Sequence, residues 1–201
     1  MLEVGCGDGE LARGLVEAGY EVLAIDPGAP RGAIFRQVTL EELDDPGPFD
    51  LAVADRVLHH VQPLGPALDK LAGLSPLLVL QEFAWDRIDG ETQAWYEALR
   101  GELVAAGREP EGPPNLDRWR LEHRDLHRSD VVLEAVAERY ELRALEWRPY
   151  FYRWLALPDI ESLEQTAIDA GTIRAVGCHA VGATRERPPA RGRGTRAGRS
   201  V

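Results

Sequence analysis

The sequence predicts an α/β protein in which helices cover both faces of a mostly parallel sheet. Apolar strands alternate with helical patterns along residues 1–83, the order expected of strand–helix–strand units. The strands are near-continuous apolar runs, as in sheets that are covered on both faces. The opening stretch, MLEVGCGDGELARGL, passes from a strand into a helix through three alternating glycines, Gly5, Gly7 and Gly9. Such a turn brings bare backbone N–H groups and a helix N-terminus up to a ligand.

The first half of the chain carries five expected strands and two expected helices. Residues 2–4 form a strand that ends at the glycines. A helix follows over residues 10–18, where Leu11 and Leu15 recur at helical spacing and Gly19 stops it. The other strands are expected at residues 21–25, 33–38, 49–54 and 76–83, and the second helix at residues 64–74.

The second half has longer helical patterns and late strands. A helix is expected over residues 90–107, ended by the Pro-rich stretch EPEGPPN. Ser129 is expected as the N-cap of a helix that runs to about Tyr140. Two late strands, residues 141–147 and 172–184, enclose a helix at about 159–170. Residues 119–127 are mostly polar with interspersed aromatic residues, and no secondary structure is predicted for them.

The charge is unevenly distributed along the chain. The last segment, residues 185–201, holds six Arg and one Glu and carries +5, whereas residues 1–184 carry −16. The acidic body repels phosphate backbones, so we expect no nucleic-acid partner. The segment is rich in Pro, Gly and Arg. We therefore expect it to be disordered, and a solvated end is favoured over a contact with nucleic acid or an acidic surface.

The two cysteines, Cys6 and Cys178, lie far apart and form no metal-ligand spacing with histidine. This usage fits a reducing compartment and argues against a disulfide scaffold. No run of 18 apolar residues and no secretory signal is found. We therefore expect a cytoplasmic protein with no membrane partner.

Two classes of ligand use a glycine turn of this kind. Dinucleotides favour G-x-G-x-x-G with an acidic residue near the end of the second strand. Here the third glycine comes one residue early, and Glu10 stands where that pattern has its last glycine. Glu3, Asp8 and Glu10 are poor neighbours for a pyrophosphate and good neighbours for a cation.

The stretch LEVGCGDGELARGLVEAGYEVLAIDP resembles the first two motifs of class I S-adenosylmethionine-dependent methyltransferases. FDLAVADRVLHHV resembles their fourth-strand motif, PLLVLQEF their fifth strand and RAVGCHAVGAT their seventh, antiparallel strand. The resemblance is close over residues 1–83 and looser over 129–184. It implies a Rossmann-like, doubly wound sheet of seven strands, mostly parallel, with an antiparallel last strand. The domain would span residues 1–184, with 84–128 as an insertion or lid.

The resemblance also assigns a cofactor, S-adenosyl-L-methionine, and residues that bind it. Glu3 would face the amino group of the methionine moiety. The floor under the cofactor would be the backbone of Gly5, Cys6, Gly7 and Gly9.

The remaining cofactor residues would follow the second and fourth strands. Asp26 would accept hydrogen bonds from both ribose hydroxyls, and Pro27 would pack near the adenine. Asp55 and Arg56 would lie beside the sulfonium and the methionine. Many family members hold the adenine amino group with an Asp after the third strand. Thr39 stands near that place here, so no adenine ligand is assigned.

The chain also departs from the family at its start. Met1 falls inside the first strand, and the helix that precedes this strand in the family is missing. We interpret the recorded start as internal, or the chain as a fragment.

Methyl transfer from a sulfonium requires an aligned nucleophile and the exclusion of water, and a general base helps when the nucleophile is protonated. His59 and His60 follow the fourth strand and are the candidate catalytic residues. His60, which matches the family's Glu-His-Val pattern, is preferred over His59. Packing or capping of the loop by these histidines is the alternative.

Two further groups of side chains have open roles. His123 and His127 are four residues apart in HRDLH, but there is no obvious third ligand, so no metal site is predicted. Aromatic residues gather after the fifth strand, where the family shapes its acceptor pocket, and they are either pocket or core. They are Trp85, Trp95, Trp119, Tyr150, Tyr152 and Trp154. Helical spacing with Leu99 and Leu103 favours core for Trp95.

The function predicted from these observations is methyl transfer from S-adenosylmethionine to a small-molecule acceptor. One alternative is a non-catalytic binding protein of methyltransferase fold. A nicotinamide-dependent oxidoreductase is less favoured because the glycine spacing of this chain differs from the dinucleotide-binding pattern. The acceptor, the methylated atom and the oligomeric state stay open.

Overall fold

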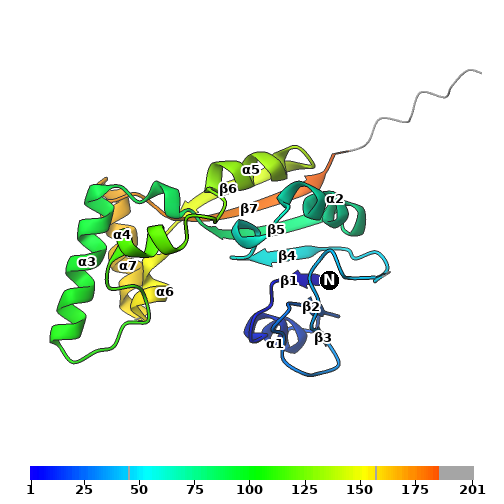
Figure 1. The fold of residues 1–201 in the computed structure, drawn as a ribbon, viewed down its shortest axis with the longest axis horizontal. Coiled ribbons are helices and arrows are strands. Elements are labelled where there is room, and N and C mark those ends of the chain that lie inside the picture. Colours follow the sequence, from blue (N-terminus) through cyan, green and yellow to red (C-terminus); the bar gives the residue numbers. More distant parts are fainter. Residues whose placement is uncertain (45, 157, 186–201) are drawn as a thin grey trace, which may run out of the picture.

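A computed structural model describes residues 1–44, 46–156 and 158–185. The basic tail was predicted to be disordered. Its residues from 186 onward lie outside the described residues. The strands are β1 (Leu2–Val4), β2 (Leu23–Ile25), β3 (Phe35–Arg36), β4 (Ala52–Asp55), β5 (Leu77–Phe83), β6 (Tyr140–Arg148) and β7 (Gly177–Thr184). They form one sheet in the order β3-β2-β1-β4-β5-β7-β6 (Figure 1).

The pairing within this sheet confirms the predicted fold class. The strands β1 to β5 pair in parallel, in registers that set Glu3 beside Ala24 and Val53. The last strand, β7, runs antiparallel between β5 and β6. The chain order reverses between β1 and β4, and ligands of open α/β sheets bind at such a switch point, beyond the carboxyl ends of the strands.

The helices are α1 (Glu10–Glu17), α2 (Leu64–Leu74), α3 (Gly90–Ala105), α4 (Leu116–Glu122), α5 (Ser129–Ala137), α6 (Phe151–Leu155) and α7 (Pro158–Asp169). Two 3₁₀ turns, Leu58–His60 and Trp85–Arg87, follow β4 and β5. In Figure 1, α3, α4, α6 and α7 gather beyond one end of the sheet. Residues of α4 and α6 line the site described below.

Helices lie on both faces of the sheet, as predicted. Leu2 and Val4 of β1 belong to the main core, together with Leu68 of α2 and Val132 of α5. Alternate residues of a strand point to opposite faces. Ala24 of β2 accordingly packs with Ala12 of α1 in a separate small core on the other face. Glu3 shares that second face, which is the face of the site.

A second core joins the end of β5 to the helices beyond it. It contains Phe83, Tyr96, Leu116, Tyr150, Phe151, Leu155, Ile160 and Val176, and the tryptophans at 85, 95, 119 and 154 pack against it. Trp95 is therefore a core residue, as its helical spacing favours. Burial of these aromatic rings holds α3, α4 and α6 against the sheet.

Three expectations for the second half need correction. The helices α4 and α6 were not predicted, and the last strand begins at Gly177 rather than at residue 172. Ser129 is the first residue of α5, and Arg128 is its N-cap. The Ser129 backbone N–H and hydroxyl donate instead to the carboxylate of Asp86, at 2.8 and 3.2 Å. This carboxylate, 43 residues away in sequence, fulfils the capping role that was expected of Ser129 itself.

Within the described residues, none of the helices is long and apolar enough to cross a membrane.

Candidate functional site

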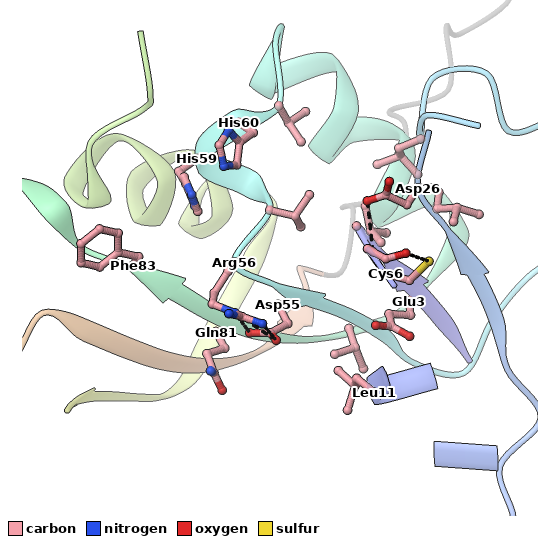
Figure 2. A pocket seen from close by; sticks show the side chains of 18 of the residues that line it. Glu3, Cys6, Leu11, Asp26, Asp55, Arg56, His59, His60, Gln81 and Phe83 are labelled. Atoms are coloured by element: carbon pink, nitrogen blue, oxygen red, sulfur yellow. Dashed lines mark hydrogen bonds and ion pairs between the residues drawn. The ribbon is translucent and has the colours of Figure 1, made fainter. Parts of the chain in front are cut away.

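A cavity of about 1430 Å³ opens at the carboxyl ends of β1, β2, β4 and β5. Its wall includes ten of the eleven sequence-predicted site residues: Glu3, Gly5, Cys6, Gly7, Asp26, Pro27, Asp55, Arg56, His59 and His60. Figure 2 shows Glu3, Cys6 and Asp26 toward one end of it and His59 and Phe83 toward the other, with Asp55 and Arg56 between. Gly9 is not in the wall. Its position beneath Phe35 makes it a packing residue of the turn.

The glycine turn is held against the end of β2. The backbone N–H groups of Gly5 and Cys6 both donate to the Ile25 carbonyl, at 2.8 and 3.1 Å. Gly7 donates to Asp26 Oδ2 at 3.2 Å. Gly5, Gly7 and Gly9 all have positive φ angles, of 76°, 52° and 81°, which explains why glycine occupies every second position.

These glycines differ in what a methyl group would meet, which gives a first testable prediction. A Cβ at Gly5 would lie 2.3 Å from Val57 Cγ2, whereas a Cβ at Gly7 would meet nothing within 4 Å. We expect Gly5→Ala to lower the free energy of unfolding by about 3 kcal/mol, and Gly7→Ala by about 1 kcal/mol, the strain of its φ alone. Urea denaturation of both variants measures this difference. Equal losses of unfolding free energy in the two variants would show that the close approach of Val57 does not require glycine at position 5.

Asp26 lies at the end of β2 with its carboxylate fixed by backbone donors. Oδ2 accepts from Gly7 N and Oδ1 from Gly28 N, the latter at 2.7 Å. Each carboxylate oxygen retains a further lone pair. The side chain lines the cavity and is only half-buried, so it can accept hydrogen bonds from a ligand hydroxyl pair.

Glu3 is the most unusual group of the site. It is 2% exposed, and Glu3 Oε2 is buried without a hydrogen-bond partner in the described structure. Burial raises the pKa of Glu3 to about 7, with further increases from the negative charges of Asp55 and Asp8. A buried carboxylate without a partner is costly unless a cation or donor reaches it.

Asp55 and Arg56 form an ion pair at the end of β4, with Arg56 Nη2 3.1 Å from Asp55 Oδ2. Arg56 has a positive φ of 55°, and its backbone N–H donates to the Gln81 carbonyl at 2.7 Å. Such strain in a residue other than glycine is concentrated at functional sites, because the surrounding contacts must maintain it. The charges of Asp55 and Arg56 therefore partly neutralise each other in the middle of the cavity.

His59 is held by a buried carboxylate that sequence reasoning missed. Glu82 Oε2 contacts His59 Nδ1, and Glu82 Oε1 accepts from the backbone N–H groups of Val57 and Leu58 at 3.1 and 2.6 Å. Both side chains are buried, at 2% and 6% exposed. One signal was available in the sequence, since Glu82 is the single charged residue of the apolar strand PLLVLQEF. A carboxylate on Nδ1 fixes the ring and leaves Nε2 as a proton acceptor.

His60, the preferred candidate from sequence, is less firmly placed. Its ring centroid lies 4.2 Å from that of His59, and its side chain forms no hydrogen bond with any described residue. Burial lowers the pKa of His60, with a further decrease from His59. The structure thus brings both histidines to the cavity but gives an orienting partner to His59.

The two histidines of the HRDLH segment lie within hydrogen-bond distance of backbone carbonyls. His123 Nδ1 lies 2.8 Å from the Trp119 carbonyl and His127 Nε2 2.9 Å from the Val61 carbonyl. Among the described residues there is no group of three His, Cys, Asp or Glu side chains that could hold a metal ion. His123 nonetheless lines the cavity, stacked on Trp119 with centroids 4.3 Å apart.

Comparison with known proteins identifies the family of this chain. A family model described as a methyltransferase domain matches residues 1–171. The chain belongs to this methyltransferase domain family, within the class I S-adenosylmethionine-dependent methyltransferase superfamily.

Individual relatives cover the chain to different extents. The ubiquinone biosynthesis O-methyltransferase of Rhodopseudomonas palustris (strain TIE-1) is 33% identical over 87 residues, which is 37% of this chain and 34% of that protein. The chain thus aligns with about a third of the length of the curated relatives it matches.

Solved structures share the fold along most of the chain. An S-adenosylmethionine dependent methyltransferase from Mesorhizobium loti aligns with a TM-score of 0.55 and 16% identity, over 92% of this chain and 90% of that one. The N-methyltransferase NodS from Bradyrhizobium japonicum WM9, in complex with S-adenosyl-L-homocysteine, aligns with a TM-score of 0.50 and 13% identity, over 92% and 77%. At these identities the likeness concerns the fold alone.

Proposed function

We propose that this protein transfers a methyl group from S-adenosyl-L-methionine to a small-molecule acceptor. The observation that carries the proposal is the buried, unpartnered carboxylate of Glu3, facing the cavity beside the glycine turn. The α-ammonium group of the cofactor supplies the cation that this carboxylate lacks. Ubiquinone O-methyltransferases are among the relatives, which supports an oxygen acceptor for this chain.

The residues present fit the ammonium, methionine and ribose parts of the cofactor. Glu3 would pair with the ammonium group, the backbone of the turn from Gly5 to Gly7 would lie under the methionine, and Asp26 would bind the ribose hydroxyls. Pro27 would contact the adenine, and Asp55 and Arg56 would lie near the sulfonium. When bound, the cofactor supplies a methyl group already activated by positively charged sulfur. The cavity exceeds the few hundred to about 1000 Å³ of an ordinary ligand pocket, so it has room for cofactor and acceptor together.

In this proposal His59 is the general base. Its Nδ1 is held by Glu82, so its Nε2 is free to take the proton of an acceptor hydroxyl. Glu82 is a positioning residue, because it acts through His59. His60 is the alternative base, and its lack of an orienting partner in the described structure makes it the weaker one.

The position of α4, the charge of the chain and its free thiols support a domain, a class of partner and a compartment. Residues 1–184 would form the catalytic domain, and the segment 84–128 its lid, since α4 lies at the acceptor end of the cavity. The −16 charge of this domain favours a small acceptor over nucleic acid. Cys6 and Cys178 are free thiols, which fits a cytoplasmic, reducing environment.

Calorimetric titration with S-adenosylhomocysteine tests the cofactor site. We expect micromolar binding to the wild type and at least a hundredfold loss in Asp26→Ala, because two hydrogen bonds to a charged acceptor contribute about 3 kcal/mol or more. Asp50→Ala is the matched control, since Asp50 is exposed and outside the cavity wall. Binding that survives Asp26→Ala would remove Asp26 from the site. Competition by NADH would favour an oxidoreductase, and binding without transfer to any screened acceptor would favour a non-catalytic protein.

A further inference from the structure

The two ends of the cavity differ in their ionisable side chains. Its wall contains the carboxylates of Glu3, Asp8, Glu10, Asp26, Glu41 and Asp55, all from the first 55 residues. The wall residues from 56 onward include no carboxylate, and they contribute the basic side chains of Arg56, His59, His60, His123 and Arg153. The acidic end suits a cationic cofactor. At the other end, called the basic end below, Arg56 is paired with Asp55, and Arg153 supplies a positive charge that suits an anionic acceptor.

The basic end is walled by flat aromatic rings. Phe83 and Tyr150 stack with centroids 4.1 Å apart, and Trp119 and Trp154 meet Phe83 edge-on at 5.6 and 4.8 Å. All four rings also line the cavity. Trp119, Tyr150 and Trp154, whose role the sequence left open, thus pack in the core on one side and line the pocket on the other. Rigid aromatic walls favour a flat, apolar ligand body.

Arg153 is the cation of this end that has no ion-pair partner among the described residues. It lies on α6, with its guanidinium 5.4 Å from the ring centroid of Tyr152. Burial raises the pKa of Tyr150 to about 12, and the positive charges of Arg56 and Arg153 partly oppose this increase. Arg153 therefore lies close enough to Tyr150 to affect its pKa. Arg56 is paired with Asp55. Arg153 therefore retains its full capacity to bind an anion, and its planar fork matches a carboxylate.

The segment that carries Arg153 is held in place from within the fold. Glu164 of α7 is fully buried and accepts from the backbone N–H groups of Tyr150, Phe151 and Tyr152, at 2.7, 3.1 and 2.9 Å. This carboxylate caps the short helix α6 and fixes the wall before any ligand binds. A preformed wall loses less conformational entropy on binding.

We propose that the acceptor is a hydroxylated aromatic carboxylate, with its ring against these aromatic side chains and its carboxylate on Arg153. This inference rests on the proposed function. The acceptor hydroxyl oxygen forms the new bond to the methyl carbon, the carbon–sulfur bond breaks with its electron pair left on sulfur, and the hydroxyl proton goes to His59. Arg153 is then the residue that selects an acid over a neutral ring.

The test compares 3,4-dihydroxybenzoate with its neutral isostere 3,4-dihydroxybenzamide by calorimetry, with and without saturating S-adenosylhomocysteine. We expect the wild type to bind the acid at least tenfold more tightly than the amide. Arg153→Gln should reduce this preference to less than twofold, and Arg153→Lys should retain part of it. Arg143→Gln is the control, because Arg143 is exposed, paired with Glu141 and outside the cavity wall.

Each outcome bears on the inference. Equal affinity of the wild type for acid and amide, a preference that survives Arg153→Gln, or no binding of either probe would overturn it. Failure of S-adenosylhomocysteine to bind would instead contradict the proposed function. An acid preference that depends on Arg153 without cofactor would still support the anion site.

Discussion

Replacing His59 by Asn is expected to lower the rate constant of methyl transfer by about 10²- to 10⁴-fold, the usual contribution of a general base. Asn has no proton acceptor of suitable basicity at the position of Nε2. The affinity for S-adenosylhomocysteine should stay within about twofold of wild type, because His59 lies away from the end of the cavity that holds Glu3 and Asp26. Single-turnover kinetics with the first acceptor that a small-molecule screen returns measures the first effect, and calorimetry the second.

The control for His59 is its neighbour. His60→Asn should lower the rate constant less than tenfold, since the His60 ring has no partner to orient it among the described residues. A large loss in His60→Asn with a small loss in His59→Asn would reverse the assignment. Added imidazole should restore part of the activity of His59→Ala, a rescue that a purely structural role does not predict.

Glu82 can be tested separately from folding. In Glu82→Gln the amide oxygen can still accept from Val57 N and Leu58 N, while the NH₂ group would face His59 Nδ1. The proton of the neutral ring would then move to Nε2, where it blocks proton acceptance. Nitrogen-15 NMR of the His59 ring should report this change of tautomer. An unchanged tautomer together with unchanged kcat would remove Glu82 from the mechanism.

The parts of the fold that were predictable are those with local signals. The apolar runs placed β1, β2, β4 and β5 correctly, and the bounds of α2 match the predicted 64–74. The helix α4 also had a local signal that was overlooked: Asn115 caps it by accepting from Arg118 N at 2.7 Å. The helix α6 had none, because its N-terminus is capped by Glu164, which comes later in the chain.

The site divides in the same way. Glu3, Gly7 and Asp26 belong to contiguous motifs, so the sequence alone assigned them. The Glu82–His59 pair joins β5 to the turn after β4, and the aromatic wall joins β5 to α4 and α6. These contacts exist only through tertiary packing. The resemblance of contiguous motifs therefore predicted cofactor-binding residues in detail and left the acceptor pocket open.

Replacing Glu3 by Gln is expected to stabilise the protein without ligand at pH 7.5 while removing most of its affinity for S-adenosylhomocysteine. The pKa of Glu3 is raised from 4.5 to about 7 in the folded state, chiefly by burial and then by Asp55 and Asp8. The stability that this group contributes is therefore present below about pH 4.5 and is lost as the pH rises through 7. The loss amounts to about 3 kcal/mol for a shift of this size. Urea denaturation between pH 5 and 8 should show this decline in the wild type and not in Glu3→Gln.

Binding should show the opposite dependence on pH, because only the ionised carboxylate pairs with the ligand's ammonium group. The affinity of the wild type should rise between pH 5.5 and 7.5, by up to tenfold per unit below the pKa, with proton release on binding. The affinity of Glu3→Gln should be weak and nearly constant over this range. A variant that is less stable than wild type at pH 7.5, or a wild-type affinity that does not change with pH, would contradict this account. The first result would mean that Glu3 has a partner that compensates its burial, and the second that the ammonium group binds elsewhere. If both expectations hold, the strain of an unpaired buried carboxylate is a cost that the folded protein carries in order to bind its cofactor.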